Sequence, residues 1–214
     1  MSRIWLFDLD GTLIDSMPTG VDIVLQFLRE RGVSYPDNFI EIITPLGYKG
    51  IAKYYAENMG IPMTADEIFA VFQEKTLHAY SKVIPLKQGV KKTLETLKTK
   101  GDRLFVLTAS PNALIELSLK RLGVFDLFEE TWSVEQFSWT KANKELFYEI
   151  AKRLGVSTSD CIMVDDNYNV LKVAKSAGMQ TVGVYDEYSQ ATQTELRAAA
   201  DCYAARFDEI LEMK

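Results

Sequence analysis

The chain has 214 residues and a formal net charge of −6, with 47% hydrophobic and 25% charged residues. This composition excludes a mainly disordered chain and is sufficient for one sizeable core, or for a core domain that carries a smaller inserted one. The acidic balance argues against a nucleic acid or an anionic membrane surface as the main partner, because both demand a basic face.

The N-terminal region carries a single Arg3, and its apolar run stops at Asp8, so it predicts neither a signal peptide nor a membrane-spanning helix. We therefore expect a cytoplasmic protein. The two cysteines, Cys161 and Cys202, have neither metal-ligand spacing nor the density of a disulfide scaffold. The single His78 lies in a helical pattern, which argues against a histidine-based catalytic triad.

Short apolar runs rich in β-branched and aromatic residues predict five strands. These runs cover residues 4–7, 103–108, 130–134, 161–164 and 181–185. Helical patterns lie between most of them, at residues 89–101, 112–123, 144–155 and 170–178. The alternation predicts an α/β fold, a doubly wound, Rossmann-like parallel sheet with helices on both faces and right-handed crossovers.

Residues 16–84 interrupt this alternation directly after the first strand. No strand pattern appears there, and helical patterns follow one another at 21–32, 50–60 and 65–83. We expect a smaller α-helical domain at 16–84, inserted into a core formed by residues 1–15 and 85–214. Because ligands of open α/β sheets bind beyond the carboxyl ends of the strands, this insertion is expected to cover the site as a lid.

Polar side chains follow four of the predicted strands. They are Asp8 and Asp10, Thr108 to Ser110, Lys141, and Asp165 with Asp166. Each signal alone has an ordinary explanation, since Asp-Gly is a common turn and most lysines are solvated. Acids this close together require a cation or a shared proton, and oxygen ligands that leave room for substrate suit Mg²⁺. The conjunction at the strand ends predicts a magnesium site.

Four segments in order carry a resemblance to a known family: FDLDGTLID at 7–15, LTAS at 107–110, Lys141 followed by Phe147, and MVDDNYN at 163–169. They resemble the haloacid dehalogenase superfamily, and the resemblance covers essentially the whole chain. The helical block is similar to the cap of its phosphoglycolate phosphatase-like branch. Where the family commonly carries a further aspartate in the fourth segment, this chain has Asn169.

The resemblance implies that Asp8 is a nucleophile that forms an aspartyl-phosphate, and that Asp10 is first general acid and then general base. Side chains two residues apart on a strand point the same way, so both carboxylates can face one phosphate. Gly11 permits a sharp turn and a close backbone approach, and Thr12 can fix that turn by hydrogen bonding.

The remaining roles also follow from the resemblance. Thr108 and the backbone N–H groups of Ala109 and Ser110 would hold phosphoryl oxygens, and Lys141 would offset negative charge, with Lys144 as the rival lysine. The implied Mg²⁺ ligands are Asp8, the Asp10 carbonyl and Asp165, while Asp166 either ligates the ion or orients a metal-bound water.

We therefore expect a Mg²⁺-dependent phosphomonoester hydrolase for a small phosphorylated metabolite, working as a monomer or homodimer. Lys49, in a predicted Gly-flanked loop at 45–50, would pair with a second anionic group of the substrate, unless it is simply a solvated lysine. Two alternatives remain open: a phosphomutase similar to β-phosphoglucomutase, which keeps both acids, and a binding or regulatory protein without turnover. A phospho-accepting receiver domain fits less well, because such domains are about half this length.

Overall fold

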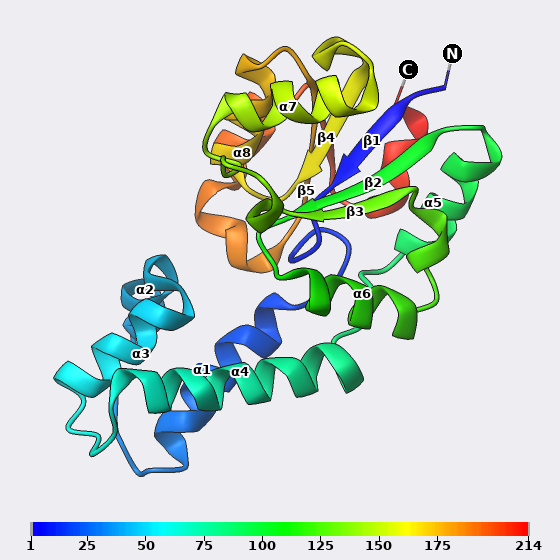
Figure 1. Cartoon of the computed structure of the whole chain (residues 1–214). Helices are drawn as coiled ribbons and strands as arrows, with labels where there is room; N and C mark the ends of the chain where they lie inside the picture. Colours follow the sequence, from blue (N-terminus) through cyan, green and yellow to red (C-terminus); the bar gives the residue numbers. More distant parts are fainter. Residues whose placement is uncertain (1, 214) are drawn as a thin grey trace. The chain divides into compact units, whose positions relative to one another are not determined.

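The computed structural model describes residues 2–213, apart from the side chains of Pro45, Gln190 and Ala191 (Figure 1). Two compact units are present. One comprises Met1–Ser16 and Ile84–Lys214, and the other comprises Met17–Val83. The role of the second unit as a lid stays a prediction.

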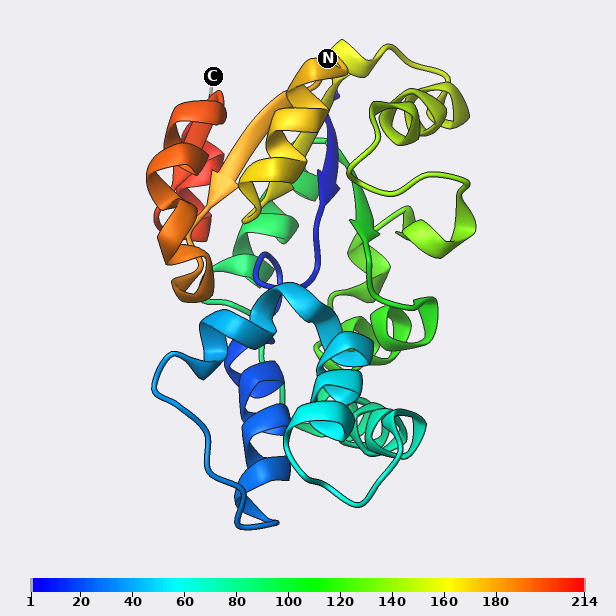
Figure 2. The same ribbon diagram turned by 90° about the vertical axis from the view of Figure 1, so that its left-hand side faces the viewer.

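The first unit is built on a six-stranded sheet in the order β3-β2-β1-β4-β5-β6, in which all neighbouring strands are parallel (Figures 1 and 2). The strands are β1 Ile4–Phe7, β2 Arg103–Thr108, β3 Glu130–Ser133, β4 Cys161–Asp165, β5 Gln180–Val184 and β6 Cys202–Ala204. The chain leaves β1 toward β2 and β3 and later returns on its other side with β4. This order confirms the doubly wound α/β fold. The short β6 was not expected from the sequence.

Helices and short 3-10 turns follow the strands of this unit. They are α5 Val90–Thr99, α6 Asn112–Arg121, η2 Phe125–Leu127, η3 Val134–Gln136, α7 Lys144–Leu154, η4 Thr158–Asp160, α8 Tyr168–Ser176, η5 Glu187–Thr192, α9 Gln193–Ala199 and η6 Phe207–Glu212. All four residues of β1 are buried, as expected for a parallel strand that is covered on both faces.

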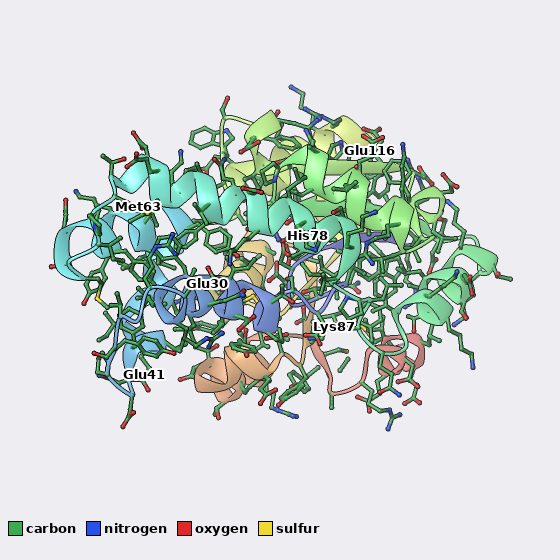
Figure 3. The ribbon with its side chains drawn as sticks, turned by 90° about the horizontal axis from the view of Figure 1, so that it is seen from below. Glu30, Glu41, Met63, His78, Lys87 and Glu116 are labelled. Carbon is green, nitrogen blue, oxygen red and sulfur yellow. The ribbon has the colours of Figure 1, made fainter. Side chains whose placement is uncertain are left out.

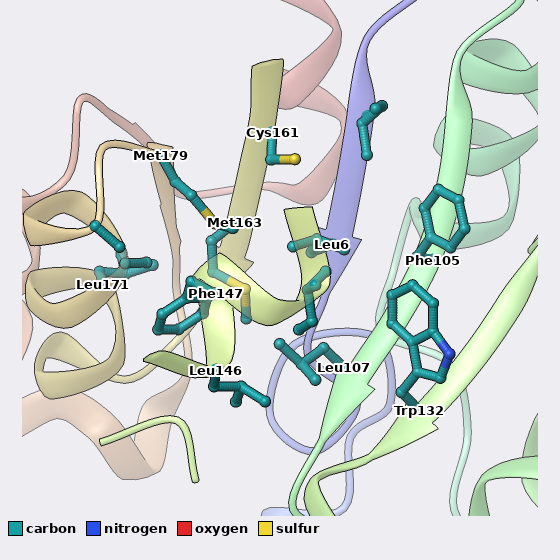
Figure 4. Packing of buried hydrophobic residues seen from close by; sticks show 14 of the residues in the cluster. Leu6, Phe105, Leu107, Trp132, Leu146, Phe147, Cys161, Met163, Leu171 and Met179 are labelled. Atoms are coloured by element: carbon teal, nitrogen blue, oxygen red, sulfur yellow. The ribbon is translucent and has the colours of Figure 1, made fainter. Parts of the chain in front are cut away.

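Side chains of successive strand residues enter different cores. Leu6 and Met163 belong to a cluster with Phe147 of α7 and Leu171 of α8 (Figure 4). On the other face, the ring of Phe7 lies 6.0 Å from that of Phe207 in η6, measured between centroids. The sheet is thus clamped between two apolar layers, which leaves its strand ends as the place for polar side chains.

The second unit consists of α1 Met17–Arg29, α2 Phe39–Ile43, η1 Thr44–Leu46, α3 Gly47–Asn58 and α4 Ala65–Lys82. Aromatic rings form its core, with Phe27 and Phe72 edge to face at 5.4 Å, and the Tyr55 hydroxyl donates to the Val24 carbonyl at 3.1 Å. The prediction of a loop around Lys49 is wrong, because α3 already begins at Gly47. Lys49 lies in the first turn of a helix.

Within the described residues 2–213, no helix combines the length and the apolar character that crossing a membrane requires.

Asp102 holds β1 to the start of β2 at the amino ends of the strands. Its carboxylate accepts hydrogen bonds from the Arg3 backbone N–H at 3.0 Å and from the Trp5 indole Nε1 at 3.0 Å, and the residue is buried. An unpaired buried donor costs about 1–3 kcal/mol.

We predict that Asp102→Ala lowers the free energy of unfolding by about 2–3 kcal/mol, because two donors lose their acceptor at once. Urea denaturation measures this change. The matched control is Asp126→Ala on η2, which removes an exposed acid and should change stability by less than about 0.5 kcal/mol. Equal stability of the two variants would contradict the assigned role of Asp102.

Candidate active site

The central strands β1 and β4 bring two acids together at the carboxyl edge of the sheet. The Asp8 backbone N–H donates to the Val164 carbonyl at 2.9 Å, so the ladder between these strands extends to the residue after β1. Asp165 is the last residue of β4. Because the strand order reverses at this point, the edge forms the crevice in which open α/β sheets bind ligands.

Lys141 lies between these two acids. Its Nζ donates to Asp8 Oδ1 and, at 2.9 Å, to Asp165 Oδ2. All three residues are buried, whereas the rival Lys144 is exposed in the first turn of α7. The structure therefore joins Lys141, rather than Lys144, to the acids at the ends of β1 and β4.

Asp8, Asp165 and Asp166 form a group suited to a cation. One carboxylate oxygen of each lies within 4.8 Å of the others, and all three residues are buried. Asp165 is further fixed because its Oδ1 accepts from the Asn167 backbone N–H at 2.8 Å. Three buried carboxylates with one lysine leave negative charge uncompensated, and an all-oxygen donor set favours a hard ion such as Mg²⁺. The residues present thus fit a magnesium ion.

Burial and crowding change the proton affinity of these groups. Burial raises the pKa of Asp8 well above its ordinary value, and the neighbouring acids act in the same direction, while Lys141 opposes them. Burial also raises the pKa of Asp166 to about 7, with a further contribution from the charge of Asp165. Burial alone would lower the pKa of Lys141, but Asp165 and Asp8 raise it above its usual range. Lys141 therefore stays charged at neutral pH.

Both oxygens of Asp166 accept hydrogen bonds from hydroxyl groups. Thr12 Oγ1 donates to Oδ1 at 3.1 Å, and Ser189 Oγ donates to Oδ2 at 2.7 Å. Gly11 has a φ of +79°, and a Cβ added there would lie 2.9 Å from Asp166 Oδ2. Glycine is thus required at position 11 both by its backbone angle and by the close approach of the carboxylate.

Ser189 was missed by the sequence analysis. It lies in η5, in the segment that follows β5. Its only signal in the sequence is a hydroxyl located shortly after a predicted strand end, and the same is true of many loop serines. Its contact with Asp166 becomes visible only when the loops are placed in space.

Ser110 contacts Asp10 through its side chain. Ser110 Oγ donates to Asp10 Oδ2 at 2.6 Å, while the Ser110 backbone N–H donates to Thr108 Oγ1 at 3.1 Å. Asp10 is thereby oriented by the segment after β2. The expected contacts of Thr108, Ala109 and Ser110 with phosphoryl oxygens stay a prediction.

Lys49 belongs to the helical unit, where its Nζ lies 5.5 Å from the centroid of the Phe69 ring. The contact of Lys49 with an anionic group of the substrate stays a prediction. Asn169 lies in the first turn of α8, and its backbone N–H donates to Asn167 Oδ1 at 2.9 Å.

Known proteins resemble the chain along most of its length. The family described as haloacid dehalogenase-like hydrolase matches residues 5–184. The chain is 28% identical over 184 residues to the pyrophosphatase PpaX of Bacillus velezensis, covering 84% of this chain and 81% of the relative. It is 29% identical over 192 residues to the phosphoglycolate phosphatase of Mannheimia succiniciproducens, covering 86% of this chain and 85% of the relative.

A solved structure supports the fold independently. It is that of a protein from Thermotoga maritima provisionally described as a β-phosphoglucomutase, with a TM-score of 0.82 and 22% identity, over 98% of this chain and 97% of that one. The phosphatase relatives confirm the predicted enzyme class, a haloacid dehalogenase-type phosphatase. From the match over residues 5–184, the chain belongs to the haloacid dehalogenase-like hydrolase family.

Proposed function

We propose that this protein is a Mg²⁺-dependent hydrolase of small phosphomonoesters that works through an aspartyl-phosphate on Asp8. The observation that carries the proposal is the position of Asp8 beside the charged Lys141, in a buried group of acids at the sheet edge. Phosphoglycolate is one candidate substrate, since the chain is similar to a phosphoglycolate phosphatase.

In the proposed first step, a carboxylate oxygen of Asp8 attacks phosphorus while the bond to the substrate's alcohol oxygen breaks. Asp10 gives its proton to the departing oxygen, and its hydrogen bond from Ser110 holds the carboxyl in place. In the second step, Asp10 takes a proton from water, which attacks phosphorus and releases Asp8 and inorganic phosphate. Lys141 offsets negative charge during both steps.

Asp8, Asp165, the Asp10 carbonyl and Asp166 would hold Mg²⁺, the last either directly or through a water. When bound, the ion supplies positive charge that draws the phosphoryl group toward the nucleophile.

A phosphomutase is the second candidate. The same two acids would serve it, and the fold is shared with the provisionally described β-phosphoglucomutase. The two functions differ in their products, because a mutase returns the phosphoryl group to a sugar hydroxyl and a hydrolase transfers it to water.

The first test is phosphate release from phosphoglycolate, sugar phosphates and nucleoside monophosphates, with Mg²⁺ and with chelator. We expect Mg²⁺-dependent release that falls about a thousandfold or more in Asp8→Asn, because the nucleophile is lost. The matched control is Asp126→Asn, which changes an exposed aspartate on η2 in the same way. Activity retained by Asp8→Asn would remove the proposed nucleophile, and hexose 1-phosphate isomerisation without phosphate release would favour the mutase.

The role of Asp10 predicts a dependence on the leaving group. Asp10→Asn should slow the transfer of phosphate from alkyl esters by about 100-fold or more, and from p-nitrophenyl phosphate much less, because a nitrophenolate departs without a proton. Single-turnover quench experiments measure this first step separately from hydrolysis of the intermediate. Equal losses for both esters would argue against general acid catalysis by Asp10.

The raised pKa of Asp166 predicts how stability changes with pH. Between about 4, the ordinary value of an aspartate, and about 7, the folded metal-free protein binds more protons than the unfolded chain. Its stability should therefore decrease as the pH rises through this window, and the raised pKa of Asp8 acts in the same direction.

Melting temperatures between pH 5 and 7.5 measure this effect. With chelator the melting temperature should fall toward higher pH, and with Mg²⁺ the fall should be reduced, since the ion binds the ionised carboxylates. Asp166→Asn should flatten the slope in chelator. The same slope in all three samples would contradict the assigned electrostatics.

A further inference from the structure

Lys87 lies just after the point where the chain re-enters the first unit, and its ammonium group meets three acceptors. Figure 3 labels the position of Lys87. Its Nζ donates to the Gly11 carbonyl at 2.6 Å, to the Tyr185 carbonyl at 2.6 Å and to Asp186 Oδ2 at 3.0 Å. The Lys87 side chain is 19% exposed and that of Asp186 is 3% exposed. Three acceptors use all three donors of an ammonium group.

One of the segments that Lys87 holds carries the first hydroxyl donor to Asp166. The Gly11 carbonyl belongs to the peptide that leads into Thr12, and the Thr12 hydroxyl donates to Asp166 Oδ1. The Lys87 backbone N–H also donates to the Leu13 carbonyl at 3.0 Å. Lys87 therefore holds the segment 11–13 by its side chain and by its backbone.

The other segment that Lys87 holds carries the second donor. Asp186 Oδ1 accepts from the Tyr188 backbone N–H at 2.9 Å, and the Asp186 carbonyl accepts from Gln193 Nε2 at 3.3 Å. These contacts shape the turn from which Ser189 donates to Asp166 Oδ2. Without Lys87, the nearly inaccessible carboxylate of Asp186 would lose its cation, which is strongly unfavourable.

We infer that Lys87, paired with Asp186, is a positioning residue that fixes Asp166 for metal binding, by tying together the two segments that supply Thr12 and Ser189. This inference rests on the proposed Mg²⁺-dependent function. The hydrogen bonds of the Lys87 side chain go to Gly11, Tyr185 and Asp186, and not to Asp8 or Asp166. Lys87 would therefore act on Asp166 only through these two segments.

The test compares Lys87→Met, which keeps the length of the side chain and removes the ammonium, with Lys92→Met on the exposed side of α5 as matched control. Calorimetric titration with Mg²⁺ in the absence of substrate measures affinity, and phosphate release gives kcat and the Mg²⁺ concentration for half-maximal rate. We expect Lys87→Met to weaken Mg²⁺ binding about 10-fold or more, as for other outer-shell contacts, and Lys92→Met to leave it unchanged.

A double-mutant cycle that combines Lys87→Met with Ser189→Ala tests whether Lys87 acts on Asp166 through the segment that carries Ser189. If Lys87 acts through the Ser189 segment, the loss of Mg²⁺ affinity in the double variant should be smaller than the product of the two single losses. Lys87→Arg is a milder second variant should Lys87→Met fold poorly. Its planar fork cannot reproduce the three contacts of a compact ammonium, so an intermediate Mg²⁺ affinity is expected.

A melting temperature lowered in Lys87→Met with Mg²⁺ affinity and kcat equal to those of Lys92→Met would assign Lys87 a purely structural role and overturn the inference. Fully independent losses in the double-mutant cycle would also overturn it. Failure of the proposed function looks different, since the unaltered protein would then neither bind Mg²⁺ nor release phosphate.

Discussion

The site depends on the compensation of several buried negative charges by one lysine. Asp8, Asp165 and Asp166 lie together out of solvent, and Lys141 contacts the first two. A buried carboxylate without a partner is strongly destabilising, so Lys141 stabilises this edge of the fold whatever part it has in the proposed chemistry. A single ammonium cannot balance three ionised acids, and the charge that would remain suits the divalent cation of the proposed function.

The order of the strands brings these acids together. Backbone hydrogen bonds between the loop after β1 and the chain near residue 85 then hold that loop in place. Since β1 and β4 are neighbours, Asp8 and Asp165 share one edge of the sheet. The loop after Asp10 is joined to the chain that returns from the helical unit, because Asp15 N–H donates to the Pro85 carbonyl at 3.0 Å and Ile14 forms a bridge with Leu86. The segment that follows β1 and the chain that returns at residues 85–86 are therefore joined by backbone hydrogen bonds.

Much of the fold could be predicted from the sequence, because buried parallel strands leave strong apolar runs separated by helical periodicity. Strand β6 could not, since it has three residues and begins at the exposed Cys202. The start of α3 at Gly47 was also missed, because Gly47 and Gly50 suggest a loop when read locally. At β6 and at the start of α3, packing against the rest of the unit outweighs the local sequence preference.

Some residues of the candidate site could likewise be predicted from the sequence, and others could not. The acids at the strand ends could be predicted because parallel strands bring their carboxyl ends to one edge, and the choice of Lys141 over Lys144 came from the family resemblance rather than from spacing. Lys87 and Ser189 could not be predicted. Lys87 contacts Gly11 across 76 positions of the chain, and no periodicity connects two such residues.

The hydrogen bonds to Asp166 bear on how it can serve a metal. Each carboxylate oxygen has two lone pairs, and the hydroxyls of Thr12 and Ser189 occupy one on each oxygen. One lone pair per oxygen remains for a cation or for a water bound to it. Two neutral donors therefore fix the direction of the carboxylate without cancelling its charge, whereas an ammonium in the same place would compete with the ion. Under the proposed function, this difference favours a place for Lys87 one step farther out, where it orders the two donors and leaves the Asp166 carboxylate to ionise as Mg²⁺ binds.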